Sequence, residues 1–250
     1  MKKQFAILTL LGCLVAMVCF LGCEVQKPQQ ITQTTKQATA TKSRSVEIPL
    51  DDAQGVVSTT RNFYFVIDGS GSMNDRPGGA CKGDQSHANK LAGAKWAVGQ
   101  FMDNMPADVN LGLYVFDSNG QREVVPLGSN NRRAFMDAVD DVSGGGGTPL
   151  ADAIRAGTNK LVTQYKKQLG YGSYRLVVVT DGDASGIPGA AKYATKKGVP
   201  IYTIGLCIGN NHPLRDHSVS YQAADNFDDL AQALQETMAE TQTFDATEFK

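Results

Sequence analysis

The chain has few of the residues and motifs on which most enzyme active sites depend. It contains three histidines and five cysteines among its 250 residues and no Cys-x-x-Cys pair, so a zinc site of the usual spacing is not expected. It also lacks a Gly-x-Ser-x-Gly nucleophile elbow and a Gly-x-x-x-x-Gly-Lys phosphate loop. We therefore expect a protein that is not an enzyme and takes no small-molecule substrate.

An excess of charge of one sign is also missing. The 24 lysines and arginines are balanced by 25 aspartates and glutamates, which gives a net charge of −1 at pH 7. Neither a basic tract nor a strongly acidic tail is present, and a basic surface is what nucleic-acid binding requires. We expect no nucleic-acid partner, and the charge balance names no other partner.

The first 23 residues have the three-part layout of a secretory signal peptide. Two lysines follow Met1, an uncharged and almost wholly apolar run spans residues 5–22, and Cys23 closes the segment. The sequence Phe-Leu-Gly-Cys at 20–23 is similar to the bacterial lipobox, although Phe20 replaces the usual leucine and Leu21 is bulkier than the small residue common there. This similarity implies that Cys23 is the lipidated first residue of a mature lipoprotein in the cell envelope.

Two alternatives remain for this segment. An uncleaved N-terminal membrane anchor needs about 20 apolar residues, which the run nearly supplies, and simple secretion needs only a cleaved signal peptide. We favour the lipoprotein, then the anchor, then secretion, and all three place the rest of the chain outside the cytoplasm. Glu24, in place of aspartate, follows Cys23, and lipoprotein sorting rules then favour the outer membrane if the source is Gram-negative.

Residues 24–56 differ in composition from both the leader and the rest of the chain. They are rich in glutamine, threonine, lysine and alanine, with almost no large apolar side chain before Val46. Such a segment buries too little apolar surface to offset the entropy lost on ordering. We predict a flexible tether that spans roughly 30 Å on average. A leader with no required reach fits the same composition.

Strand and helix patterns alternate from residue 57 to residue 243, and residues 244–250 form a C-terminal tail. The alternation predicts one α/β domain with a doubly wound, Rossmann-like, mostly parallel sheet and helices on both faces. The predicted strands are 63–68, 109–116, 122–126, 175–180, 199–206 and, at a sheet edge, 218–223. The predicted helices are 86–105, 130–142, 149–169, 188–197 and 227–241.

Oxygen-bearing side chains follow two of the buried strands. Asp68, Ser70 and Ser72 end the first strand, with glycines between them that allow a tight turn, and Asp181 ends the strand at 175–180. Thr148 adds a hydroxyl just before a helix, after the four glycines at 144–147. Ligands of such sheets bind beyond the carboxyl ends of the strands, and oxygen ligands suit a hard cation such as Mg²⁺.

In this order, the three segments resemble the von Willebrand factor type A domain and its metal-ion-dependent adhesion site, over roughly residues 60–240. The resemblance implies that Asp68, Ser70, Ser72, Thr148 and Asp181 form the shell of a Mg²⁺ ion, or of Mn²⁺ or Ca²⁺. It also implies that the loop before Thr148 and the last helix shift when affinity changes. An ordinary glycine-rich connection is the alternative.

Two carboxylates and three neutral hydroxyls leave much of the charge of a divalent cation unquenched, so a free coordination position attracts a carboxylate from outside. We expect an envelope-tethered module, attached to the membrane through a lipid anchor, that captures an aspartate or glutamate of a protein partner. A structural subunit of an envelope complex with a non-exchanging metal is the alternative. A metal-dependent hydrolase is a minor one.

Cys81 and Cys207 lie outside the leader, and both follow predicted strands on the edge that carries the proposed ligands. In an oxidising compartment this placement predicts a disulfide between them, with two free thiols as the alternative. The loop at 73–86, which contains Cys81, is either a wall around the metal or a solvated insertion.

Other polar residues on the same edge receive a plainer interpretation. Asp117 and Asp183 follow strands, and we expect solvated carboxylates there in preference to outer partners of the metal. The scattered histidines, His87, His212 and His217, are expected to be surface or capping residues.

Overall fold

The computed structural model describes residues 50, 54–81, 84 and 86–239, and of Ala239 it describes the backbone only. These residues all lie in one compact unit, Ser45–Lys250. The predicted signal peptide and lipobox at 1–23, nearly all of the tether at 24–56 and the tail at 244–250 lie outside the described residues. Within the described part, no helix has the length and apolar character needed to cross a membrane.

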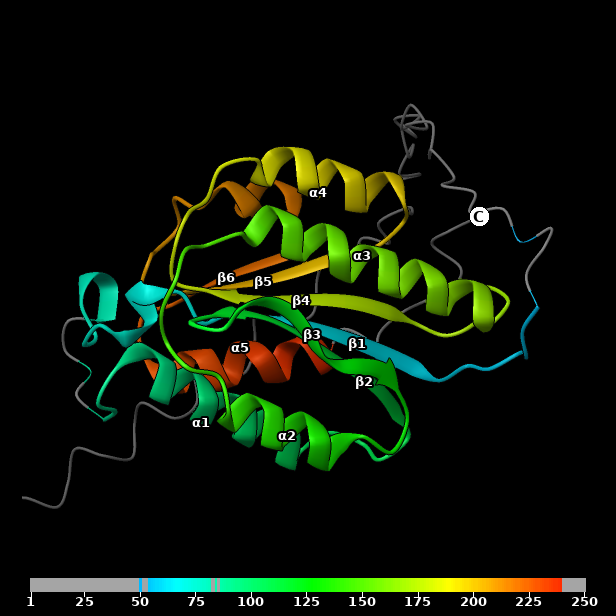
Figure 1. The fold of residues 1–250 in the computed structure, drawn as a ribbon, viewed down its shortest axis with the longest axis horizontal. Coiled ribbons are helices and arrows are strands. Elements are labelled where there is room, and N and C mark those ends of the chain that lie inside the picture. The colour runs from blue at the N-terminus through cyan, green and yellow to red at the C-terminus, as the bar shows by residue number, and fades with distance from the viewer. Residues whose placement is uncertain (1–49, 51–53, 82–83, 85, 240–250) are drawn as a thin grey trace, which may run out of the picture. The chain divides into compact units, whose positions relative to one another are not determined.

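A six-stranded sheet forms the centre of the domain (Figure 1). The strands lie in the order β3-β2-β1-β4-β5-β6 and are parallel, except that β2 and β3 form an antiparallel hairpin. They are β1 (Arg61–Asp68), β2 (Val109–Asp117), β3 (Gly120–Gly128), β4 (Tyr174–Thr180), β5 (Ile201–Leu206) and β6 (Ser220–Ala224). The chain builds the sheet outward from β1 in both directions, so the switch point of strand order lies between β1 and β4.

Helices cover both faces of the sheet (Figure 1). On one face lie α1 (Lys90–Asp103), α2 (Arg132–Asp140) and α5 (Phe227–Ala239), and on the other lie α3 (Leu150–Lys167) and α4 (Ile187–Lys196). Short 3₁₀ turns follow β1 at Gly71–Asn74 and Gly79–Cys81, and a third follows β5 at Pro213–His217. This arrangement confirms the predicted doubly wound α/β fold.

The alternation of side chains along β1 divides the core into two layers. Phe63, Phe65 and Ile67 join the cluster beneath α1, α2 and α5, whereas Tyr64 and Val66 join the cluster beneath α3 and α4. All five are buried, and burying a large apolar side chain contributes about 1.5–3 kcal/mol. A slip of one residue would exchange the two faces, so this packing fixes the register of β1 and the position of the residue that ends it.

Three helices begin later than predicted, and α2 does so by two residues, at Arg132 instead of residue 130. Helix α1 begins at Lys90 instead of residue 86, because Asn89 caps it and accepts a hydrogen bond from the backbone N–H of Ala92 at 2.8 Å. Helix α3 begins at Leu150, and Pro149 precedes the first turn instead of lying in it. The remaining predicted helices and strands are present, with small shifts of their ends.

Candidate metal centre

The candidate site starts at the buried end of β1. The Asp68 side chain accepts a hydrogen bond from Ser70 N through Oδ1 at 2.8 Å, and one from Thr180 Oγ1 through Oδ2 at 2.6 Å. Burial raises the pKa of the Asp68 carboxyl, and the hydrogen bonds from Ser70 and Thr180 oppose this shift, whereas the nearby Asp181 carboxylate adds to it. Thr180 was not among the predicted site residues, although it directly precedes one of them.

Parallel pairing of β1 with β4 brings the second carboxylate to the same edge. Ile67 of β1 pairs with Val179 of β4, so the residues that follow them are neighbours. Ser72 Oγ donates to Asp181 Oδ1 at 2.8 Å and lies 3.1 Å from Ser70 Oγ. The structure therefore joins Asp68, Ser70, Ser72 and Asp181 through hydrogen bonds at the switch point of the sheet.

The glycine-rich loop that carries Thr148 packs against this group. Gly71 N donates to Gly146 O at 3.2 Å, and Gly145 N donates to Gly69 O at 2.9 Å. Gly145 and Gly146 have φ values of 152° and 78°, which residues with a side chain rarely adopt. These backbone contacts place the loop beside the serines, and the partly exposed Thr148 follows two residues after Gly146.

A lysine that the sequence did not single out also belongs to the site. Lys90, the first residue of α1, places its Nζ 2.8 Å from Asp181 Oδ2. The Lys90 side chain is 13% exposed and that of Asp181 is 0% exposed, so the ion pair is largely shielded from water. A lysine in the first turn of a helix is placed against the helix dipole, but the predicted helix start at residue 86 put Lys90 beyond the first turn.

Asp117 is not the solvated carboxylate that we predicted. Its side chain is buried, and Arg122 donates to both of its oxygens, at 2.7 and 3.2 Å. Backbone N–H groups of Asn119 and Ser143 also donate to it. Burial acts to raise the pKa of Asp117, but these donors outweigh it and the pKa lies below its ordinary value. Asp117 therefore joins the β2–β3 hairpin to the start of the glycine-rich loop.

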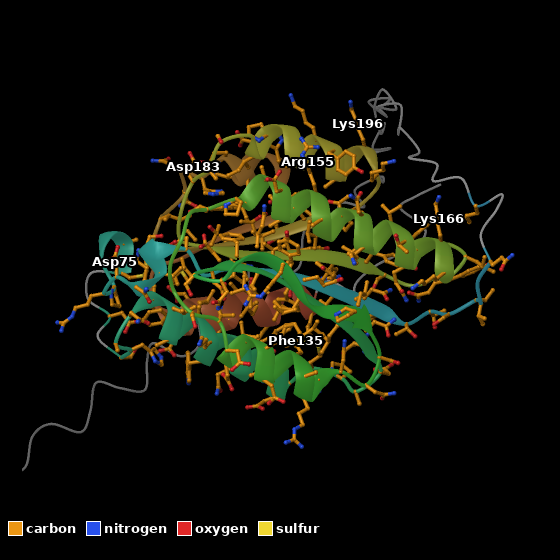
Figure 2. The ribbon with its side chains drawn as sticks, viewed as in Figure 1. Asp75, Phe135, Arg155, Lys166, Asp183 and Lys196 are labelled. Atoms are coloured by element: carbon orange, nitrogen blue, oxygen red, sulfur yellow. A yellow bond between two sulfur atoms is a disulfide. The ribbon has the colours of Figure 1, made fainter. Side chains whose placement is uncertain are left out.

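Asp183 does lie in solvent, as predicted. The residue is exposed, and its Oδ1 accepts a hydrogen bond from the following backbone N–H, that of Ala184, at 2.7 Å. It lies at the same end of the domain as Asp75, on the side where β1 and β4 end (Figure 2).

Of the three histidines, His212 differs most from a surface residue. It is buried, and its Nδ1 accepts a hydrogen bond from Leu214 N at 3.1 Å, which caps the 3₁₀ turn as a capping residue should. Nε2 lies 3.0 Å from Gly182 O, so the ring is neutral and its proton on Nε2 is donated to this carbonyl. Burial lowers the pKa of His212 and favours this neutral form. The histidine thereby fixes the backbone that follows Asp181.

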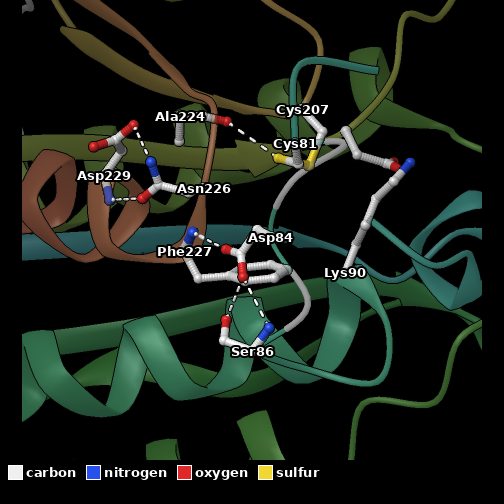
Figure 3. Close-up of a disulfide and its surroundings, with 10 residues drawn as sticks. Cys81, Asp84, Ser86, Lys90, Cys207, Ala224, Asn226, Phe227 and Asp229 are labelled. Carbon is white, nitrogen blue, oxygen red and sulfur yellow. Dashed lines mark hydrogen bonds and ion pairs between the residues drawn. A yellow bond between two sulfur atoms is a disulfide. The ribbon is translucent and has the colours of Figure 1, made fainter. Parts of the chain in front are cut away.

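Cys81 and Cys207 are joined by a disulfide on the same edge of the sheet (Figure 3). Three residues after Cys81, the Asp84 carboxylate accepts a hydrogen bond from Phe227 N at 3.0 Å, at the start of α5. Both cysteines are buried. The described part of the loop is therefore packed against β5 and α5 and is not simply a solvated insertion.

The atoms of this site that could bind a metal are all oxygens, from two carboxylates and neighbouring hydroxyls. Such a set fits a hard divalent cation, which prefers oxygen ligands and retains several waters. Among the described residues, no group of three or more histidine, cysteine, aspartate or glutamate side chains is placed to hold a metal ion. Serine and threonine hydroxyls would therefore have to complete the coordination.

Comparison with known proteins identifies the family of this chain. The family profile of the von Willebrand factor type A domain matches residues 62–249, so the chain belongs to this family. Domains of this family generally act as interaction or adhesion modules. No curated protein matches the chain.

Solved structures share the fold at low sequence identity. BatB from Bacteroides thetaiotaomicron is 19% identical, with a TM-score of 0.55 over 73% of this chain and 98% of that chain. The von Willebrand factor domain of the type V pili tip protein Mfa5 from Porphyromonas gingivalis is 13% identical, with a TM-score of 0.54 over 74% and 96%. Proximal thread matrix protein 1 from the mussel byssus, solved with a zinc-occupied MIDAS motif, is 14% identical, with a TM-score of 0.54 over 74% and 48%. At these identities the likeness concerns the fold alone.

Proposed function

We propose that this domain is a metal-dependent binding module that captures a carboxylate of a protein partner. Asp68, Ser70, Ser72, Thr148 and Asp181 would hold a Mg²⁺-type ion, and an aspartate or glutamate of the partner would complete its coordination. The observation that carries this proposal is the hydrogen-bonded group of two buried carboxylates and two serine hydroxyls at the switch point of the sheet.

The charge of the site supports capture of an anion. Asp68 and Asp181 carry two negative charges, but Lys90 Nζ lies 2.8 Å from Asp181 Oδ2 and the hydroxyls of the remaining ligands add no charge, so a divalent cation would bring an excess of positive charge. An open coordination position at such an ion favours a carboxylate over a neutral ligand. The family, and neighbours that are a pilus tip protein and a byssus protein with metal in this motif, favour adhesion over catalysis.

A calorimetric titration of the full-length chain in detergent with Mg²⁺, Mn²⁺ and Ca²⁺ tests the metal site. We expect saturable binding that T148A weakens, because one of the proposed ligands is lost. The matched control is T163A, since the Thr163 hydroxyl is exposed and donates to Asn159 O within α3. Unchanged binding in a folded T148A variant, or no binding to the wild type, would overturn the proposed ligand set.

The partner chemistry is tested with a short peptide that contains one glutamate and with its glutamine counterpart. Binding of the glutamate peptide only when metal is present, and loss of that binding in T148A, would support carboxylate capture. Metal binding without any preference for glutamate would instead favour a structural subunit with a non-exchanging ion. Metal-dependent turnover of a phosphoester would favour a hydrolase.

We also propose that the domain is tethered to the outer face of a membrane through a lipid on Cys23. Lipidation and cleavage before Cys23 would leave the domain in the membrane fraction with a shortened chain. In C23S, we expect cleavage and lipidation to be lost, so that the chain keeps its leader and is longer than the processed wild type. If C23S stays in the membrane at the wild-type length, an uncleaved anchor explains the attachment, and if both forms are soluble, simple secretion does.

A further inference from the structure

The candidate site contains a positively charged group, the ammonium of Lys90, beside its proposed metal ligands. Both oxygens of the Asp181 carboxylate are engaged, Oδ1 by the Ser72 hydroxyl and Oδ2 by Lys90 Nζ, each at 2.8 Å. The carboxylate has no exposed surface. A metal ion that bound Asp181 directly would therefore have to share a carboxylate oxygen with one of these two partners or displace it.

The backbone that carries the lysine is fixed to the site. Lys90 N donates to Asp75 O at 3.1 Å, and Asp75 N donates in turn to Ser72 O at 3.1 Å. Asn89 caps the helix immediately before Lys90. The ammonium is thus delivered from a fixed point, but on a side chain with four methylene groups that can swing without any change in the backbone.

We propose that Lys90 is an internal counter-cation, which stabilises the metal-free site and competes with the divalent ion for Asp181. This inference rests on the proposed metal site and adds the residue that sets its affinity. Without an added cation, the Asp68 and Asp181 carboxylates would face one another in a shielded site. Lys90 supplies one positive charge to this pair. Removing that charge would leave a buried carboxylate uncompensated.

Once a dication enters, the same ammonium becomes unfavourable. Two positive charges a few ångströms apart repel strongly where water is excluded. Either the lysine leaves Asp181, which costs the energy of their ion pair, or it stays and repels the metal. Both outcomes lower the apparent affinity of the site for the metal. Replacing the ammonium by a neutral side chain of similar length should therefore tighten metal binding by about tenfold or more.

The variant K90M tests this inference in the full-length chain, with Mn²⁺ and Mg²⁺ as the probes. We expect calorimetry to give tighter metal binding than in the wild type, and thermal unfolding in EDTA to give a lower melting temperature. K90R, which retains the charge, should behave like the wild type. The matched control is K95M on the same helix, because Lys95 Nζ is exposed and donates to Asp140 O.

A residue with a merely structural role would lower stability without tightening metal binding. A folded K90M that binds metal as weakly as the wild type, or more weakly, therefore overturns the inference but leaves the proposed function standing. If the wild type binds no metal and K90M does, the inference is supported. If neither binds, the proposed metal site fails and this inference fails with it.

A measurement on the wild type keeps the inference testable if K90M does not fold. Acetylation of lysines by a water-soluble ester, followed by peptide mass spectrometry, reports how accessible each ammonium is. Saturating Mn²⁺ should raise the labelling of Lys90 relative to EDTA and leave that of Lys95 unchanged. Equal or lower labelling of Lys90 in the presence of bound Mn²⁺ would overturn the competition.

Discussion

The Cys81–Cys207 disulfide should account for a large share of the stability of the domain. The two cysteines are 126 positions apart in the sequence, so the cross-link closes a long loop in the unfolded chain. A loop of this length corresponds to about 5 kcal/mol in the chain-entropy treatment, and removing a native disulfide from a small domain typically costs roughly 2–5 kcal/mol. For a domain of this size, each kcal/mol corresponds to roughly 2–4 °C in melting temperature.

The double variant C81A/C207A removes the cross-link without leaving a lone thiol. We expect its melting temperature, measured by circular dichroism on the full-length chain, to lie about 10 °C below that of the oxidised wild type. Wild-type protein reduced with a phosphine is the matched comparison, because it retains both buried sulfur atoms and loses only the covalent bond. It should unfold close to the double variant.

Two results would refute this reasoning. Equal melting temperatures for oxidised wild type, reduced wild type and C81A/C207A would show that the cross-link does not constrain the unfolded chain as calculated. Peptide mapping under non-reducing conditions addresses the pairing itself. If the peptides containing Cys81 and Cys207 are recovered unlinked from the oxidised protein, the disulfide is absent.

Three further substitutions test the packing around the site by urea unfolding. D117A should lower the free energy of unfolding by roughly 2 kcal/mol at pH 7, because the groups that donate to Asp117 lose a buried acceptor. Folding lowers the pKa of Asp117, so its contribution to stability is lost as the pH falls below about 3.9 and through the folded-state pKa. The stability difference between wild type and D117A should therefore fade over this range. G93A should cost roughly 1–3 kcal/mol, because a Cβ there would lie 2.0 Å from Phe227 Cε1; wild-type stability would mean that α1 and α5 are less closely packed. G146A should lower the free energy of unfolding by about 1–2 kcal/mol, because Gly146 has a positive φ. G147A should leave it unchanged, because a Cβ at Gly147 would lie in open space. Equal effects of the two substitutions would contradict the loop geometry.

Most of the fold could be predicted from the sequence because each element carried a local signal. The apolar run at 63–68 is buried on both sides, as a central parallel strand must be. Helix starts were less accurate, because a capping residue such as Asn89 is one polar residue among several before α1. The edge strand predicted at 218–223 is present as β6 at one end of the sheet.

The two predicted carboxylates lie on one edge of the sheet for a physical reason that does not extend to their hydrogen-bond partners. Asp68 and Asp181 end neighbouring parallel strands, so the topology alone brings them to one edge. Lys90 reaches the same edge only through the length and direction of its side chain. Arg122 is opposite Val115 in the hairpin and therefore lies diagonally from Asp117, so the register could have suggested the contact, but not the burial of Asp117.

The glycine-rich loop at 144–147 shows how the same residues can be explained in two ways. Freedom to move was one explanation, but a Cβ at Gly145 would lie 2.9 Å from Ser118 Cβ, and one at Gly146 would lie 3.1 Å from Asp117 O. These glycines therefore permit close approach, and backbone hydrogen bonds hold the loop to Gly69 and Gly71. The backbone around the site is fixed from several sides, so at the proposed metal site the side chain of Lys90 is the part that would exchange with a cation at least cost. Metal-bound and metal-free forms should therefore differ first at that lysine, before any displacement of the loop.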